Sequence, residues 1–176
     1  VRNGSLTIQG LPVGVQYKVT ETNIPAGYTA VETVIEGTLT AAGASADFVN
    51  NYYSQPATLS AINVEKLLGR GWLDTDEFSF TISGTENMPA VTTVTIKGTD
   101  ENKTASFGPI TYDLPKGYAY TIKENEHGIQ GVGHDESEIG VVVWVKDNGQ
   151  GQMSASVTYN NDAAAVAAVF NNPYTP

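Results

Sequence analysis

Stretches in which apolar and polar residues alternate run through most of the chain, and turn sequences such as Lys116-Gly117 and Asp147-Asn148-Gly149 separate them. A period of two residues is typical of strands that bury one face, and Gly-containing turns commonly connect such strands. Residues 162–168 contain five alanines and have helix propensity, but small residues also suit a crowded sheet edge, and we favour a strand there. The pattern predicts an all-β protein.

Two similar strand ends suggest how the chain is divided. Phe48-Val49-Asn50 and Phe170-Asn171-Asn172 share a Phe-x-Asn pattern, and a short connector follows each. We therefore expect two tandem Ig-like or prealbumin-like β-sandwich domains, residues 1–53 and 57–174, with a linker at residues 54–56. A small sandwich has about seven strands. Residues 1–53 are too short to supply them, so we expect the first domain to be incomplete, with its opening strands missing from this chain.

A lysine, an acid and an asparagine interrupt the apolar rows of three expected strands in the second domain. Each has an ordinary explanation: a lysine that reaches water, a solvated strand end, and a turn asparagine. Together, in one domain, they call for a joint explanation, because buried polar groups are rarely left unpaired. The three rows are Ile62, Val64, Lys66, Leu68; Tyr118, Tyr120, Ile122, Glu124; and Val166, Ala168, Phe170, Asn172.

A covalent reaction would explain all three residues. Burial disfavours charged forms, so it lowers the pKa of a lysine and raises that of a carboxyl group. A neutral Lys66 amine is a nucleophile, and a protonated Glu124 can polarise the side-chain carbonyl of Asn172 or shuttle protons to the leaving group. The fold holds the reactants together. We predict a Lys66–Asn172 amide crosslink promoted by Glu124, formed once with release of ammonia, so that the protein modifies itself and is not an enzyme.

Residues 57–174 contain, in this order, the runs Val64–Arg70, Glu77–Phe80, Tyr120–Glu124 and Phe170–Asn172. With these runs the segment resembles the streptococcal-type pilin shaft domain. The resemblance implies a structural shaft element of a Gram-positive pilus or adhesin, anchored to the cell wall and exposed outside the cell. It also implies an internal isopeptide bond, assembly by sortase, and contacts with other pilin subunits or neighbouring domains. Asn171 stays open as the acceptor, because a one-residue register slip would exchange it with Asn172; the shared Phe-x-Asn spacing favours Asn172.

Residues 1–53 contain the runs Gly10–Glu21 and Pro25–Tyr28. With these runs the segment resembles the second half of a collagen-adhesin B-type (Cna B-like) repeat. By the same logic, Glu21 would be the acid and Asn50 the acceptor of a second crosslink. The family places the reactive lysine in an earlier strand, which is absent here, and Lys18 lies on the outward face of its strand. We therefore expect this domain to be unbonded within the chain and to react only with a complementing strand from outside.

Composition narrows the possible partners. The 176 residues include 9 Lys and Arg against 19 Asp and Glu, with a formal net charge of −10. An acidic surface repels phosphates, so we expect no nucleic-acid partner. No apolar run reaches the roughly 20 residues of a membrane helix, so we expect no membrane insertion. The sequence shows no signal peptide, so export of the protein is an inference and is not read from the sequence directly. Cysteine is absent, so a surface domain would need its core or another crosslink in place of disulfides.

Metal and cofactor sites have little support in the sequence. His127 and His134 lie in a Gly-rich stretch, and their spacing matches no compact zinc motif. We expect them in a solvated loop. The acidic groups at residues 74–77 and 135–138 do not have the form of a calcium loop, and surface charge is the simpler explanation. We expect no metal and no cofactor.

Two other functions remain as alternatives. One is a carbohydrate- or matrix-binding β-sandwich module of a surface adhesin, in which Trp72 and Trp144 would form a platform for sugars. Trp144 lies in a Val-rich strand, where a packing role is favoured, whereas Trp72 lies near a turn and is the more open candidate. The other is a hydrolase, but no nucleophile-elbow sequence supports a Ser-His-Asp site.

Overall fold

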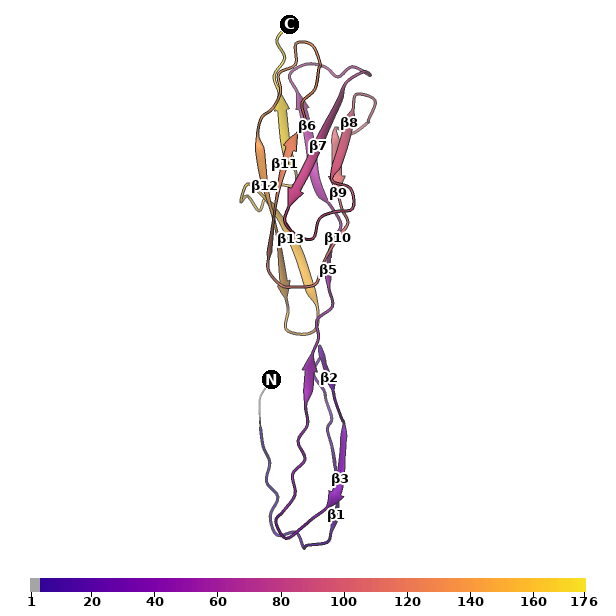
Figure 1. The fold of residues 1–176 in the computed structure, drawn as a ribbon, viewed down its shortest axis with the longest axis vertical. Coiled ribbons are helices and arrows are strands. Elements are labelled where there is room, and N and C mark those ends of the chain that lie inside the picture. The colour runs from indigo at the N-terminus through magenta and orange to yellow at the C-terminus, as the bar shows by residue number, and fades with distance from the viewer. Residues whose placement is uncertain (1–3) are drawn as a thin grey trace. The chain divides into compact units, whose positions relative to one another are not determined.

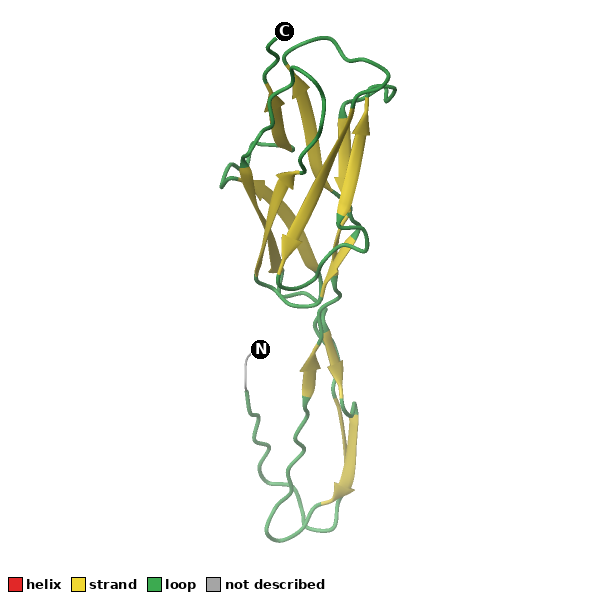
Figure 2. Cartoon of the chain, turned by 45° about the horizontal axis from the view of Figure 1, so that its top comes forward, coloured by secondary structure: helices red, strands yellow, loops and turns green. Residues whose placement is uncertain are grey.

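The computed structural model describes residues 4–176, so residues 1–3 of the expected first domain lie outside it. Every regular element in the described part is a β-strand, as predicted (Figures 1 and 2). Within that part, no helix has the length and apolarity needed to cross a membrane. The chain divides into two compact units, the first comprising the residues up to Ser54 with Gly149–Gly151 and the second comprising the remainder.

The second unit is a β-sandwich (Figure 1). One sheet has five strands in the order β13-β12-β11-β7-β8, and the other has three in the order β14-β6-β9; β10 and β5 form a separate pair. The strands are β5 (Ala57–Leu59), β6 (Ile62–Leu68), β7 (Glu77–Gly84), β8 (Thr93–Lys97), β9 (Thr104–Phe107), β10 (Ile110–Tyr112), β11 (Gly117–Glu124), β12 (Glu138–Asp147), β13 (Met153–Tyr159) and β14 (Ala168–Asn172).

The core of the second unit lies between the two larger sheets. Residues on β6, β11 and β14 alternate between buried and more exposed positions, as their sequence pattern predicts. Phe80 of β7 packs against Phe170 of β14 with ring centroids 5.1 Å apart, so the inner faces of the sheets meet there. Each large apolar side chain buried in this way contributes about 1.5–3 kcal/mol, and the core holds twenty buried hydrophobic residues.

The first and last long strands of the sandwich are neighbours. β14 pairs with β6 in parallel, with Phe170 opposite Lys66 and Asn172 opposite Leu68. Asn172 is fully buried and Asn171 is exposed. The register therefore turns Asn172, and not its neighbour, to the same interior as Lys66.

The strand expected over residues 162–168 does not form. β14 begins only at Ala168, and Val166, expected on the inward row, is 77% exposed. The preceding turn explains the difference. Asn160 and Asn161 have positive φ angles, and the backbone N–H of Asp162 donates to the carbonyl of Tyr159, which reverses the chain directly after β13.

The first unit has two small antiparallel sheets (Figure 2). β1 (Gln16–Thr20) pairs with β3 (Val34–Thr38), and β2 (Tyr28–Ala30) pairs with β4 (Asn50–Tyr52). None of the described residues 4–54 is buried. Two-stranded sheets are at best marginally stable alone. The exposed large hydrophobic residues of this unit include Leu6, Ile8, Val13, Val31 and Val49.

Candidate functional site

Lys66, Glu124 and Asn172 meet in the interior of the second unit. Lys66 Nζ donates a hydrogen bond of 2.5 Å to Glu124 Oε2, and Asn172 Nδ2 donates one of 2.6 Å to Glu124 Oε1. The side chains of Lys66 and Glu124 are both 0% exposed, and Asn172 is 0% exposed as a residue. β6, β11 and β14 contribute one group each, at the positions where the alternation of each strand points inward.

Burial is the main influence on the pKa of Lys66. It lowers the pKa of Lys66, and the hydrogen bond and charge of Glu124 oppose this effect only in part. The ring of Phe78 lies 4.8 Å from Nζ and forms an apolar wall beside the amine. A lysine in such surroundings loses a proton more readily than one in water, which makes it a better nucleophile.

The amide of Asn172 is oriented differently from the sequence-based expectation. Its nitrogen, and not its carbonyl oxygen, faces Glu124, and Oδ1 has no hydrogen-bond partner within the described chain. An ionised carboxylate accepts hydrogen bonds only, which explains the preference for the N–H group. Glu124 therefore bridges the two nitrogens of the site, one through each carboxylate oxygen.

Two histidines also belong to this site, and the expectation of a solvated loop was wrong for them. His127 Nε2 lies 3.0 Å from Asn172 Nδ2 and 3.4 Å from Glu124 Oε1, and His134 Nδ1 lies 3.3 Å from Glu124 Oε1. Their side chains are 7% and 27% exposed. Burial lowers the pKa of His127, although the charge of Glu124 acts in the opposite direction. The loop after β11 is polar and Gly-rich, so no periodicity in the sequence indicated that it folds back over the acid.

One acidic residue that was expected at the surface is buried. Asp76 is 2% exposed and accepts two hydrogen bonds from Arg70, of 2.7 and 2.8 Å, together with the backbone N–H of Leu73 at 2.8 Å. Arg70 holds the pKa of this carboxyl group below its usual range. The pair ties the end of β6 to the start of β7. A second acid, Asp135, accepts the backbone N–H of Asn171 at 2.7 Å and so fixes the histidine loop to β14.

The two tryptophans have the reverse of their expected environments. Trp72 packs on the core, with its ring edge-on to Phe78 at 5.4 Å, and Lys103 Nζ lies 4.8 Å from the Trp72 ring. Trp144 is 48% exposed on β12, because its side chain points away from the core while its Val neighbours point inward. Every second residue of a Val-rich strand still faces outward, and the prediction that Trp144 packs in the core did not take this into account.

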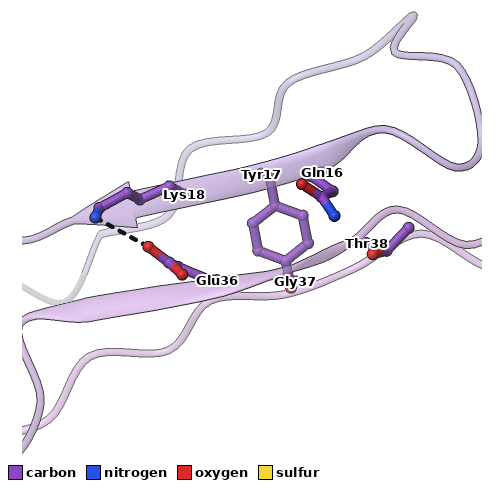
Figure 3. A pocket seen from close by; sticks show the side chains of 6 residues that line it. All are labelled: Gln16, Tyr17, Lys18, Glu36, Gly37 and Thr38. Atoms are coloured by element: carbon purple, nitrogen blue, oxygen red, sulfur yellow. Dashed lines mark ion pairs between the residues drawn. The ribbon is translucent and has the colours of Figure 1, made fainter.

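The first unit contains a similar acid–amide pair without a lysine. Asn50 Nδ2 donates a hydrogen bond of 2.6 Å to Glu21 Oε1. Glu21 Oε2 and Asn50 Oδ1 are buried atoms with no hydrogen-bond partner in residues 4–176. Lys18 forms a 2.9 Å ion pair with Glu36 in a shallow pocket between β1 and β3, beside Tyr17 (Figure 3). It is engaged there and does not contribute to the Glu21–Asn50 pair.

Sequence comparison identifies the second unit. Residues 62–175 match the model of the Spy0128-like isopeptide containing domain, FctA, and this segment is more than half of the 176-residue chain. The chain belongs to this family. Residues 62–175 are thus a pilin-like isopeptide-containing domain, and the matched segment includes Lys66, Glu124 and Asn172.

Other comparisons agree on the fold and leave the first unit open. The chain is similar to the structure of the major pilin protein (T-13) from Streptococcus pyogenes serotype GAS131465, with a TM-score of 0.51 and 20% identity over 69% of this chain. It spans 54% of that pilin, about half of its length. Residues 2–52 match a domain of unknown function, DUF7601, so their Cna B-like resemblance stays a prediction. The search of curated proteins gave no match.

Proposed function

We propose that this chain is a shaft element of a cell-surface pilus or adhesin, stabilised by an intramolecular isopeptide bond between Lys66 and Asn172. The observation on which this rests is the buried contact of both residues with Glu124, at 2.5 and 2.6 Å. An amine, a carboxyl group and an amide in the interior of a sandwich, each contacting the next, have the composition and proximity that condensation requires. The domain boundaries that we propose are residues 1–53 and 57–174, with a linker at 54–56.

The geometry suggests a proton shuttle. Lys66 first passes a proton to Glu124 Oε2 along their hydrogen bond and becomes a neutral amine. Its Nζ attacks Cγ of Asn172, the Cγ–Nδ2 bond breaks, and Nδ2 leaves as ammonia. The attacking nitrogen loses one hydrogen and the leaving nitrogen gains one, and Glu124, which contacts both nitrogens, transfers the proton. The proton that Lys66 first passed to Glu124 leaves with the ammonia as ammonium, which restores the Glu124 carboxylate. Because the crosslink is permanent, each molecule reacts once.

Such a bond would stabilise the fold in two ways. It would close a loop between residues 66 and 172, and in the chain-entropy model a loop near 100 residues adds about 4–5 kcal/mol to the free energy of unfolding. It would also join β6 and β14, which are parallel neighbours at the two ends of the domain. Tension applied along the chain would then pass through the amide bond and bypass the residues inside the loop.

The cellular setting follows from the family and is part of the proposal. A pilin-like domain of this kind would be displayed on a Gram-positive cell wall and assembled by sortase with other pilin subunits or neighbouring domains. Residues 1–53 would be completed by a strand that carries a lysine and lies outside this segment. That idea is supported by the unpartnered oxygens of Glu21 and Asn50 and by the lack of any buried residue in residues 4–54.

A binding module remains the second candidate because of Trp144. This ring is 48% exposed on the outer face of β12, where a sugar ring could stack on it. Quenching of its fluorescence by added glycans, lost in Trp144→Ala, would favour that function. A fluorescence spectrum unchanged across a glycan panel would remove it.

Single-molecule pulling on the two ends of the full chain tests the proposed function. A crosslinked domain should yield no extension from residues 67–171, whereas Lys66→Met should release a further contour length of about 350 Å, at roughly 3.3–3.6 Å per residue. Lys66→Met removes the amine and keeps an unbranched apolar side chain in its place. An equal extension in the two proteins would contradict the proposal that tension passes through a crosslink.

A further inference from the structure

Two histidine nitrogens approach the same oxygen of Glu124. His127 Nε2 lies 3.4 Å and His134 Nδ1 lies 3.3 Å from Oε1, and ligand atoms of the three side chains lie within 4.8 Å of one another. In a tetrahedral zinc site with bonds of about 2.0–2.1 Å, neighbouring ligand atoms are about 3.3–3.4 Å apart. The two N–O distances fit that geometry, and the two histidine nitrogens lie within 4.8 Å of each other. Two histidines and one glutamate are also a donor set that Zn²⁺ uses when a fourth position is open.

The lone pairs of this cluster are not all occupied by protein donors. His134 Nδ1 is a buried atom with no hydrogen-bond partner within residues 4–176, and the carboxylate of Glu124 is fully buried. A buried polar atom without a hydrogen-bond partner is destabilising unless a ligand satisfies it. The ring of His127 is held edge-on against Phe78 at 5.0 Å and has a backbone hydrogen bond with Gly133. Such support fixes ring orientation in metal sites.

Crosslinking would increase the number of unsatisfied acceptors. Before the reaction, Asn172 Nδ2 has two hydrogens and lies 2.6 Å from Glu124 Oε1 and 3.0 Å from His127 Nε2, which is an acceptor in the tautomer that carries its proton on Nδ1. The amide nitrogen that replaces it carries one hydrogen, so one of these acceptors loses its donor. Lys66 also loses its positive charge, which would otherwise repel a cation held by Glu124.

We propose that Glu124, His127 and His134 form a site for a borderline divalent cation such as Zn²⁺, and that crosslinking of Lys66 to Asn172 favours its occupancy. The ligand set stands on the geometry of the three side chains, whereas the coupling rests on the proposed function. Mg²⁺ and Ca²⁺ prefer sites made of oxygen atoms alone, so the site should discriminate against them.

Calorimetric titration of the metal-free full chain with Zn²⁺ tests the site directly. We expect one ion per chain, no binding of Mg²⁺, and, with Co²⁺, the strong visible absorption of a tetrahedral ion. His134→Ala should weaken Zn²⁺ binding by about tenfold or more, and the change at the exposed neighbour, Glu126→Gln, should leave it unchanged. Because the chain has two histidines and no cysteine, it offers no other histidine and no thiolate as a ligand for Zn²⁺. Absence of Zn²⁺ binding, or binding that persists in folded His127→Ala and His134→Ala variants, would overturn the site.

The coupling has its own test. Asn172→Ala prevents crosslinking and leaves the charge of Lys66 in place, so we expect it to bind Zn²⁺ about tenfold more weakly than the crosslinked chain. Equal affinities would overturn the coupling and leave the site standing. The intact mass of each preparation shows whether the crosslink has formed, so a failure of the proposed function can be told apart from a failure of the metal site. If the wild-type chain has lost no ammonia, the proposed function fails, and the Zn²⁺ titration still decides the site.

Discussion

Lys66 and Glu124 form an ion pair with an N–O distance of 2.5 Å, and both side chains are completely buried. A buried ion pair loses the hydration of two charges and recovers it only in part, so apolar residues of similar volume are often at least as stable. Net stabilisation of an unreacted domain is therefore a poor explanation for this ion pair. Conversion of the lysine to an amide would remove one of the two buried charges.

The acid can be tested by Glu124→Gln, for which we expect a folded domain with no ammonia lost. The amide cannot accept and return a proton, and Lys66 would keep its amine. Loss of the crosslink should lower the free energy of unfolding by about 4–5 kcal/mol and make the domain more sensitive to heat and protease. Intact mass and a thermal melt measure both effects.

The matched control for this variant is Glu126→Gln, which alters an exposed carboxylate two residues away. It should retain the crosslink and the stability of the wild-type protein. A crosslink that still forms in Glu124→Gln would show that another group acts as the acid.

The acceptor can be assigned with two neighbouring variants. Asn172→Ala should abolish the loss of ammonia, because its amide is the one that contacts Glu124. Asn171→Ala should leave it complete, because Asn171 is exposed and contributes its backbone N–H to Asp135. Peptide mapping after digestion compares the two, and the reverse pattern would mean that the reacting strand adopts the slipped register.

The first unit should contribute no crosslink within this chain. Glu21 and Asn50 are in contact, but Lys18 is paired with Glu36. Asn50→Ala should therefore leave the number of ammonia molecules lost from the chain unchanged. Mass spectrometry of this variant beside the wild type gives the answer, and a smaller loss in Asn50→Ala would reveal an internal partner for Asn50.

Asp76 should make stability depend on pH at the acidic end. Arg70 lowers the folded-state pKa of Asp76 below its unfolded value of about 3.9. The ionised pair therefore stabilises the fold fully above the unfolded pKa, and this contribution is lost as the pH falls through the folded pKa. Asp76→Asn should lower the free energy of unfolding by about 1.5–3 kcal/mol at neutral pH.

Chemical denaturation across pH measures this effect. The gap between wild type and Asp76→Asn should be constant above about pH 5 and should shrink as the pH falls below about 4. A gap that does not change with pH would show that the carboxylate charge has no part in the stability.

Strand alternation predicted most of the second unit and the convergence of its site. The inward row on β11 is buried as expected, and that on β6 is buried up to Lys66 and half-buried at Leu68, because a strand packed on one face fixes the direction of every second side chain. Asn172 could be placed for the same reason. The row on β14 failed only at Val166, where a turn defined by local backbone angles replaces the strand.

The histidines and Asp76 could not be placed by that method. Their positions depend on how irregular loops fold back on strand ends, and loops have no period to extrapolate. The orientation of the Asn172 side-chain amide was also not predicted, because it depends on which atom of that amide can donate a hydrogen bond to Glu124. Loop composition indicated surface positions for residues that tertiary contacts bury.

The intact mass of the purified chain under denaturing conditions tests the central claim most directly. We predict a mass lower than that of the sequence by one ammonia, with the crosslink mapped to Lys66 and Asn172. A deficit of two would show that the first unit is also bonded. The full sequence mass would contradict the account, because the buried lysine, acid and asparagine would then be an unreacted cluster.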